Sequence, residues 1–121
     1  MQVYKFGGAS VKDAPSVKNV AKILHDNPFK DKVVVISAMG KTTNDLEKVI
    51  NLYVAGDKAW DGALDEVYAK HLPILNDLFG SKSQEMEPPV KAIIDRVRAF
   101  LMQDHSHNYN FELSFCNCLM K

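Results

Sequence analysis

The sequence has no long apolar run and no excess of charge of either sign. Its 121 residues include 15 basic and 15 acidic side chains, and 46% of the residues are hydrophobic. Balanced charge gives no overall field that would attract nucleic acid or an anionic membrane. A membrane-spanning helix needs about 20 consecutive apolar residues, and the N-terminus lacks the charged-then-apolar order of a signal peptide. We therefore expect a cytoplasmic globular protein that binds neither nucleic acid nor membrane.

Cysteine is also scarce. The chain contains two, Cys116 and Cys118, separated by one residue. Structural zinc sites usually have Cys-x₂₋₄-Cys pairs and two further ligands. His105 and His107 could be those ligands, but they lie in a polar stretch, 104–110, that is typical of a solvated loop. The sequence therefore predicts no metal site and two reduced, partly buried thiols.

The N-terminal ten residues hold the first pattern with chemical meaning. A β-favouring run, residues 3–6, contains Lys5 and ends at Gly7 and Gly8, and a segment with helical spacing follows. Glycine has no Cβ, so a ligand can approach the backbone amides, and a helix start adds partial positive charge. With Lys5 as a full charge, this turn can bind phosphate. A plain turn is the other interpretation, and the pattern alone leaves both open.

The next segments predict a right-handed βαβ unit with parallel strands. Pro15 fits the first position of a helix that ends at Asn27-Pro28. The apolar face of that helix is expected to comprise Val17, Val20, Ala21 and Leu24. Residues 33–36 are apolar at four consecutive positions, which predicts a strand covered on both faces.

Residues 37–44 follow the carboxyl end of the second strand, where α/β sheets bind their ligands. Gly40 permits a tight turn, and Thr43 or Asn44 fits the N-cap of another helix. That helix should end at Gly56 and bury Leu46, Val49, Ile50 and Tyr53. Capping and substrate binding are both open for this loop, because a capped helix start still presents N–H groups to a carboxylate.

Two more helices are predicted farther along the chain. The first covers residues 59–79, and Pro73 should kink or split it. The second begins at the paired prolines and covers 88–102, after a loop at 81–87. His71 lies on the apolar side of the first helix, so we expect a hydrogen-bonded packing residue there rather than a catalyst.

Two of these stretches resemble a known family. Residues 5–11, Lys-Phe-Gly-Gly-Ala-Ser-Val, are similar to the Lys-Phe-Gly-Gly-Thr-Ser-Val signature of aspartate kinases, which are members of the amino acid kinase family. Residues 33–44 resemble the second strand and following loop of the same enzymes. The likeness implies an α/β fold: the N-terminal βαβ part of a three-layer sandwich, followed by helices, with an incomplete sheet. Residues 1–121 would be the N-terminal portion of the catalytic domain, without the regulatory domains.

The resemblance also implies a reaction and its site residues. Aspartate kinases transfer the γ-phosphoryl group of ATP to the β-carboxylate of L-aspartate, giving 4-phospho-L-aspartate for lysine, threonine and methionine biosynthesis. Lys5 would be the catalytic residue, and Thr43 and Ser37 would hold aspartate. The expected cofactors are ATP and Mg²⁺, and the expected assembly is a homo-oligomer. The nucleotide-binding residues implied by the resemblance are Lys5, Phe6, Gly7, Gly8, Ser10, Ser37 and Gly40.

The sequence departs from the family pattern at two places. Ala9 stands where the family usually has threonine, so a hydroxyl group near the phosphates is missing. Residues 111–121 lack the Gly-Glu pair of a later helix, so Glu112 receives no role. A two-stranded sheet has unpaired edges, which predicts marginal stability or self-association. Two alternatives stay open: another amino acid kinase acting on a different carboxylate, carbamate or phosphate, or an inactive fragment that binds nucleotide or pairs with another chain.

Overall fold

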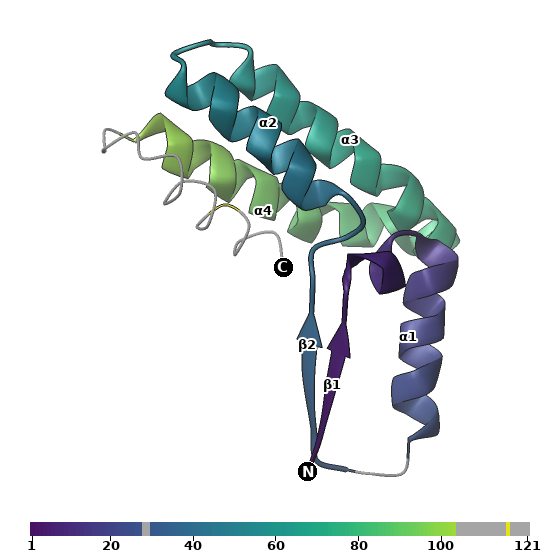
Figure 1. The fold of residues 1–121 in the computed structure, drawn as a ribbon. Coiled ribbons are helices and arrows are strands. Elements are labelled where there is room, and N and C mark those ends of the chain that lie inside the picture. The colour runs from purple at the N-terminus through teal and green to yellow at the C-terminus, as the bar shows by residue number, and fades with distance from the viewer. Residues whose placement is uncertain (28–29, 104–115, 117–121) are drawn as a thin grey trace.

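A computed structural model describes residues 1–27, 30–103 and 116. The elements in chain order are β1 (Gln2–Phe6), the 3₁₀ turn η1 (Gly8–Val11), α1 (Ala14–Asp26), β2 (Lys32–Ile36), α2 (Thr42–Val54), α3 (Trp60–Phe79), the 3₁₀ turn η2 (Gly80–Lys82) and α4 (Ser83–Met102). The helices α2, α3 and α4 form one end of the molecule, and β1, β2 and α1 extend from it (Figure 1). Among the described residues, no helix is long and apolar enough to cross a membrane.

The two strands form a parallel sheet, and α1 connects them. Gln2 pairs with Lys32 and Phe6 pairs with Ile36, so β1 and β2 are in register over their full lengths. This arrangement confirms the predicted βαβ unit, the mixed α/β class and the incomplete sheet. Asp13 caps α1 by accepting a hydrogen bond from the Ser16 amide at 2.9 Å.

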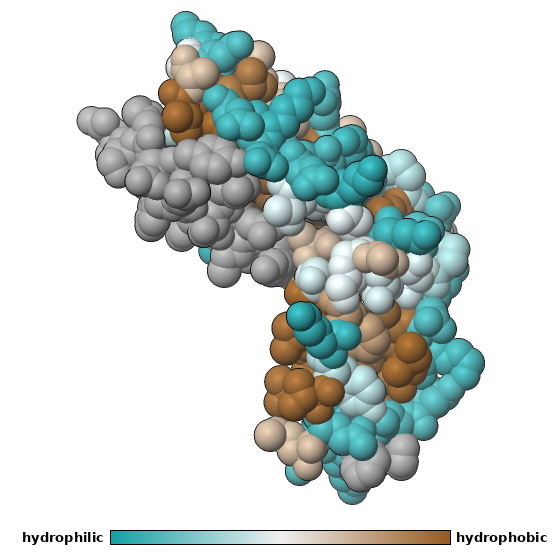
Figure 2. Space-filling view, in the orientation of Figure 1, coloured by the Kyte–Doolittle hydropathy of each residue, from teal (hydrophilic) through white to brown (hydrophobic). Residues whose placement is uncertain are grey.

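The prediction that the second strand is covered on both faces is wrong. Val33, Val34, Val35 and Ile36 of β2 are each 40–48% exposed, and apolar side chains reach the surface around the sheet (Figure 2). The reason is the placement of α1, which packs its Val20 against Phe6 of β1 and Val11 of η1. No residue of β2 belongs to this cluster. Ala21, predicted on the buried face of α1, is exposed for the same reason.

The three long helices enclose the larger hydrophobic cluster. Its members include Leu46, Val49 and Ile50 of α2, Leu64 and Val67 of α3, Ile94, Val97 and Leu101 of α4, and the buried Cys116. Tyr53 and Trp60 meet edge to face, with their ring centroids 5.8 Å apart. The buried face predicted for α2 is therefore confirmed. Gly56 ends this helix with a φ of +74°, and the amides of Gly56 and Asp57 donate to the carbonyls of Tyr53 and Leu52.

Proline interrupts the helices less than the sequence predicts. Pro73 lies inside α3, which continues to Phe79, so the helix is not split. The helix α4 begins at Ser83, and the predicted loop over 81–87 is wrong. Pro88 and Pro89 remove the donors for the carbonyls of Gln84 and Glu85. Both of those residues are exposed, so water can take the place of the missing amides.

Candidate functional site

The two candidate loops leave β1 and β2 at the same end of the sheet. The Ser37 amide donates to the Phe6 carbonyl at 3.0 Å, which extends the parallel pairing beyond the strands. The Gly40 amide then donates to the Gly8 carbonyl at 3.2 Å. The fold therefore brings the two sequence-predicted stretches, the glycine turn and the loop 37–44, side by side.

The two glycines of the turn have different structural roles. A Cβ on Gly8 would lie 2.9 Å from the Gly40 carbonyl oxygen and 3.3 Å from that of Ala38, so only glycine fits there. Gly7 has an extended backbone, with φ −76° and ψ 174°, and a Cβ on it would meet nothing within 4 Å. The fold therefore requires glycine at position 8 and leaves open space beside position 7.

Other predicted residues of the turn divide between the core and the surface. Phe6 is buried and packs with Val11 and Val20, whereas Lys5 is exposed. Successive side chains of a strand point to opposite faces, so Lys5 lies on the face away from α1. Ser10 is also exposed, and its amide donates to the Gly7 carbonyl at 3.0 Å.

The start of α2 differs from the prediction. The helix begins at Thr42, so Thr43 and Asn44 lie in its first turn and neither is the N-cap. Lys41 occupies the N-cap position without a side-chain hydrogen bond. The Thr42 amide instead donates to the Met39 carbonyl at 2.9 Å. The loop therefore enters α2 through a backbone hydrogen bond, and the Thr43 side chain is exposed in the first turn of the helix.

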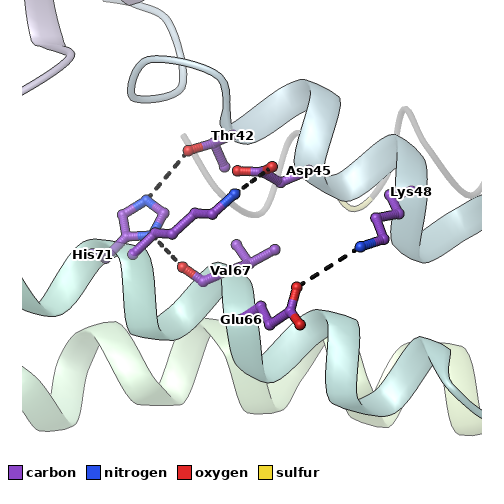
Figure 3. Close-up of polar contacts among 7 residues, drawn as sticks. Thr42, Asp45, Lys48, Glu66, Val67 and His71 are labelled. Carbon is purple, nitrogen blue, oxygen red and sulfur yellow. Dashed lines mark hydrogen bonds and ion pairs between the residues drawn. The ribbon is translucent and has the colours of Figure 1, made fainter.

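Thr42 and His71 link this loop to α3 (Figure 3). His71 Nδ1 lies 2.7 Å from the Val67 carbonyl oxygen, which can only accept, so Nδ1 carries a proton. In the neutral ring, Nε2 is then an acceptor, and the Thr42 hydroxyl donates to it across 3.4 Å. Thr42 is 5% exposed. The expectation that His71 is a hydrogen-bonded packing residue is confirmed, and the fold also places it against the site loop.

Two hollows border the loop. The first has a volume of about 220 Å³ and is mainly apolar, with Val11, Val20 and Ile36 among its lining residues. The second has a volume of about 180 Å³ and lies beside Gly40. Met39 and His71 line both. The charged residues that line the second hollow are Lys12, Lys41, Asp45 and Lys70.

Lys41 lies within the stretch 33–44 that the sequence singles out, and the other three residues lie outside both that stretch and residues 5–11. Lys12 follows η1, Asp45 lies on α2, and Lys70 lies on α3, where Lys70 Nζ is 2.7 Å from Asp45 Oδ1. A charged residue on a helix cannot be recognised as a site residue from the surrounding sequence, because most charged side chains in proteins are simply solvated at the surface. Helix packing, which the sequence does not specify residue by residue, brings the three together.

The start of α1, shortly after the glycine turn, holds a carboxyl group with a lowered pKa, that of Asp13. The Ser16 hydrogen bonds to Asp13 hold the pKa of this carboxyl group below its ordinary value. Among the described residues, no group of three or more His, Cys, Asp and Glu side chains is placed to hold a metal ion. Cys118, His105, His107 and Glu112 lie outside the described residues.

Comparison with known proteins identifies the family. The sequence model of the amino acid kinase family matches residues 1–104. The chain belongs to this family. It is 35% identical over 80 residues to "Bifunctional aspartokinase/homoserine dehydrogenase 1, chloroplastic" of Zea mays, a match that covers 66% of the chain and 9% of that protein. It is 49% identical over 57 residues to "Aspartokinase 1, chloroplastic" of Arabidopsis thaliana, covering 47% of the chain and 9% of that protein.

The expected resemblance to aspartate kinases within the amino acid kinase family is therefore confirmed. The chain spans about a tenth of the length of the curated relatives it matches.

Proposed function

We propose that the chain is the N-terminal portion of an aspartokinase catalytic domain and that its site transfers the γ-phosphoryl group of ATP to the β-carboxylate of L-aspartate. The observation that carries this proposal is the hydrogen bond between Gly40 and Gly8. It joins the two stretches that resemble aspartate kinases into one surface, and the relatives that the chain matches are aspartokinases by name.

In the proposed reaction, a carboxylate oxygen of the substrate attacks the γ-phosphorus, the bond to the bridging oxygen of ADP breaks, and ADP leaves. Lys5 would face the transferred group, and the amides of the glycine turn would hold the phosphates. Open space beside Gly7 supports close approach of a ligand there. Mg²⁺ would neutralise phosphate charge while held mainly by phosphate oxygens.

The remaining predicted residues receive supporting roles. Phe6 positions the turn from the core, while Ser10, Ser37 and Gly40 would border the nucleotide. Thr43, in the first turn of α2, would hold aspartate together with Ser37. The N-terminal end of a helix favours a carboxylate through its amides and its dipole.

Trapping of the acyl phosphate tests the reaction directly. The 121-residue chain is incubated with Mg-ATP, L-aspartate and hydroxylamine, and the hydroxamate is measured. L-Glutamate and a reaction without amino acid are the controls. Hydroxamate that depends on aspartate supports the proposal. ATP binding without hydroxamate would favour a nucleotide-binding chain that does not turn over.

Self-association and location complete the proposal. The exposed strand β2 at a sheet edge, with four apolar side chains, supports pairing with a second copy. We also propose a cytoplasmic location. The alternative is the chloroplast, because the matched plant enzymes are chloroplastic by name.

A further inference from the structure

The second hollow, beside Gly40, concentrates positive charge from separate parts of the chain. Lys12 comes from the segment between η1 and α1, Lys41 from the loop and Lys70 from α3. Lys12 is in close contact with the loop, because a Cβ on Gly40 would lie 3.7 Å from both its Cα and its Cβ. Asp45 is the single carboxylate among the residues that line this hollow. The lining therefore has an excess of positive charge that suits a small anion.

The hollow adjoins the glycine turn. Gly40 lines the hollow and donates its amide hydrogen bond to Gly8 of the turn. An acceptor whose first carboxylate lies at the turn can therefore place a second acidic group in the hollow. Lysine ammonium groups bind carboxylates as flexible point charges, so they need no fixed bidentate geometry.

We propose that Lys12 and Lys70 are specificity-determining residues that hold the second carboxylate of a dicarboxylic acceptor in this hollow. The inference rests on the proposed function, because it assumes that the first carboxylate is the phosphoryl acceptor. Charge-assisted hydrogen bonds to ammonium groups favour a dianion over a monocarboxylate. Dicarboxylates are therefore selected by charge, in addition to the shape of the site.

Asp45 allows the proposal to be distinguished from a purely structural role, because the two predict opposite effects of removing its charge. Its carboxylate, labelled in Figure 3, lies 2.7 Å from the Lys70 ammonium nitrogen. The Asp45 side chain is 26% exposed. A bound anion must share Lys70 with Asp45, so removing the Asp45 charge should strengthen anion binding. If the ion pair served only to hold α2 against α3, removal of either charge would loosen that contact. Removal of the Asp45 charge would then weaken anion binding instead of strengthening it.

The test is a set of NMR titrations of the ¹⁵N-labelled full chain at low ionic strength. The probes are succinate and L-aspartate, with butyrate and L-alanine as monocarboxylates. We expect dicarboxylates to bind about tenfold more tightly and to shift the amides of Gly40 and Lys41. Lys12→Gln and Lys70→Gln should each weaken dicarboxylate binding roughly five- to tenfold, whereas Asp45→Asn should strengthen it.

Lys48→Gln is the matched control. Lys48 also lies on α2, carries an exposed ammonium group and pairs with a carboxylate of α3, Glu66, at 3.9 Å, but it does not line this hollow. Its substitution should leave dicarboxylate binding unchanged. Equal affinity for mono- and dicarboxylates, weaker binding in Asp45→Asn, or no carboxylate binding at all would each overturn the inference.

A parallel ATP titration separates this inference from the proposed function. ATP-induced shifts at Gly7 and Gly8 without any dicarboxylate response overturn the inference alone. A dicarboxylate response without ATP binding or hydroxamate overturns the proposed function, and with it the acceptor role assigned to Lys12 and Lys70. Responses to both ligands, with the charge variants ordered as expected, support both.

Discussion

Gly40 donates its amide hydrogen to the carbonyl oxygen of Gly8, and the two backbones approach so closely that a Cβ on Gly8 would lie 2.9 Å from the Gly40 oxygen. This single contact joins the loop after β1 to the loop after β2. Packing therefore requires glycine at position 8. It does not require glycine at position 7, because a Cβ on Gly7 would meet no atom within 4 Å.

The two glycines should therefore respond differently to alanine. Gly8→Ala should lower the free energy of unfolding by about 1–3 kcal/mol, because the added methyl group forces the loops apart. Gly7→Ala should leave unfolding within about 0.5 kcal/mol of the original chain but weaken ATP binding, because the methyl group occupies the proposed ligand approach. Urea unfolding and ATP titration measure the two effects. Equal destabilisation by both substitutions would contradict this division.

Lys5→Ala should affect ligand binding and leave the fold intact. The side chain is exposed on the sheet face away from α1, so its removal should change the free energy of unfolding by less than about 0.5 kcal/mol. ATP affinity should fall, since a positive charge beside the phosphates is lost. Lys18→Ala, on the exposed surface of α1, is the control. If thermal stability and ATP binding decline together, Lys5 is structural.

Two valines of the helical layer give a matched test of its core. Val67 of α3 is 1% exposed, and Val54 at the end of α2 is 39% exposed. Val67→Ala should lower the free energy of unfolding by about 2 kcal/mol, from lost apolar burial and the cavity that remains. Val54→Ala should cost less than about 0.5 kcal/mol. Chemical denaturation of both variants decides whether this cluster is the main core.

Asp13 should make stability dependent on pH in the acid range. Its pKa is lowered in the folded chain by the Ser16 hydrogen bonds, so the ionised carboxylate favours folding. That contribution is complete above the ordinary Asp pKa and is lost as pH falls through the lower, folded value. Asp13→Asn keeps a capping oxygen but does not titrate. The melting temperature of the original chain should exceed that of the variant near pH 7, and the gap should narrow below about pH 4.

The exposed strand β2 should drive self-association. Sedimentation velocity should show a coefficient that rises with protein concentration. Val35→Lys places a charge on the strand and should abolish that rise, because charged edge strands resist pairing. Met102→Lys, an equally polar change at the exposed end of α4, should not. A chain whose sedimentation stays constant with concentration would contradict the proposed homo-oligomer.

Local patterns predicted most of the elements, because they depend on residues close in sequence. The spacing of apolar residues predicts the strands and the buried face of α2. The conformational freedom of glycine predicts the helix end at Gly56. The exposure of β2 is mispredicted because four consecutive apolar residues are typical of a strand with layers packed on both of its faces. Here α1 packs against β1 instead. The N-cap is mispredicted because α2 begins earlier than the sequence indicates: the helix starts at Thr42, whose amide donates to the Met39 carbonyl, and Lys41 takes the N-cap position.

The candidate site was predictable only in part. Glycine pairs and a lysine at a strand end are visible in the sequence, and the parallel register then brings their loops together. Lys12 and Lys70 reach the same hollow through the packing of α3 against the first half of the chain, an arrangement that no short motif encodes.

The division of the interior into two clusters has a consequence for cooperativity. One cluster joins β1, η1 and α1, the other joins α2, α3 and α4, and the loop that carries Gly40 runs between them. Two separate clusters can open as separate units, each with its own amide exchange rate. A ligand held by the glycine turn on one side and by Thr43 or Lys70 on the other would bind only when both units are closed. Such a ligand would couple the opening of the two clusters, so that amides in both would exchange hydrogen at a similar, slower rate in the complex.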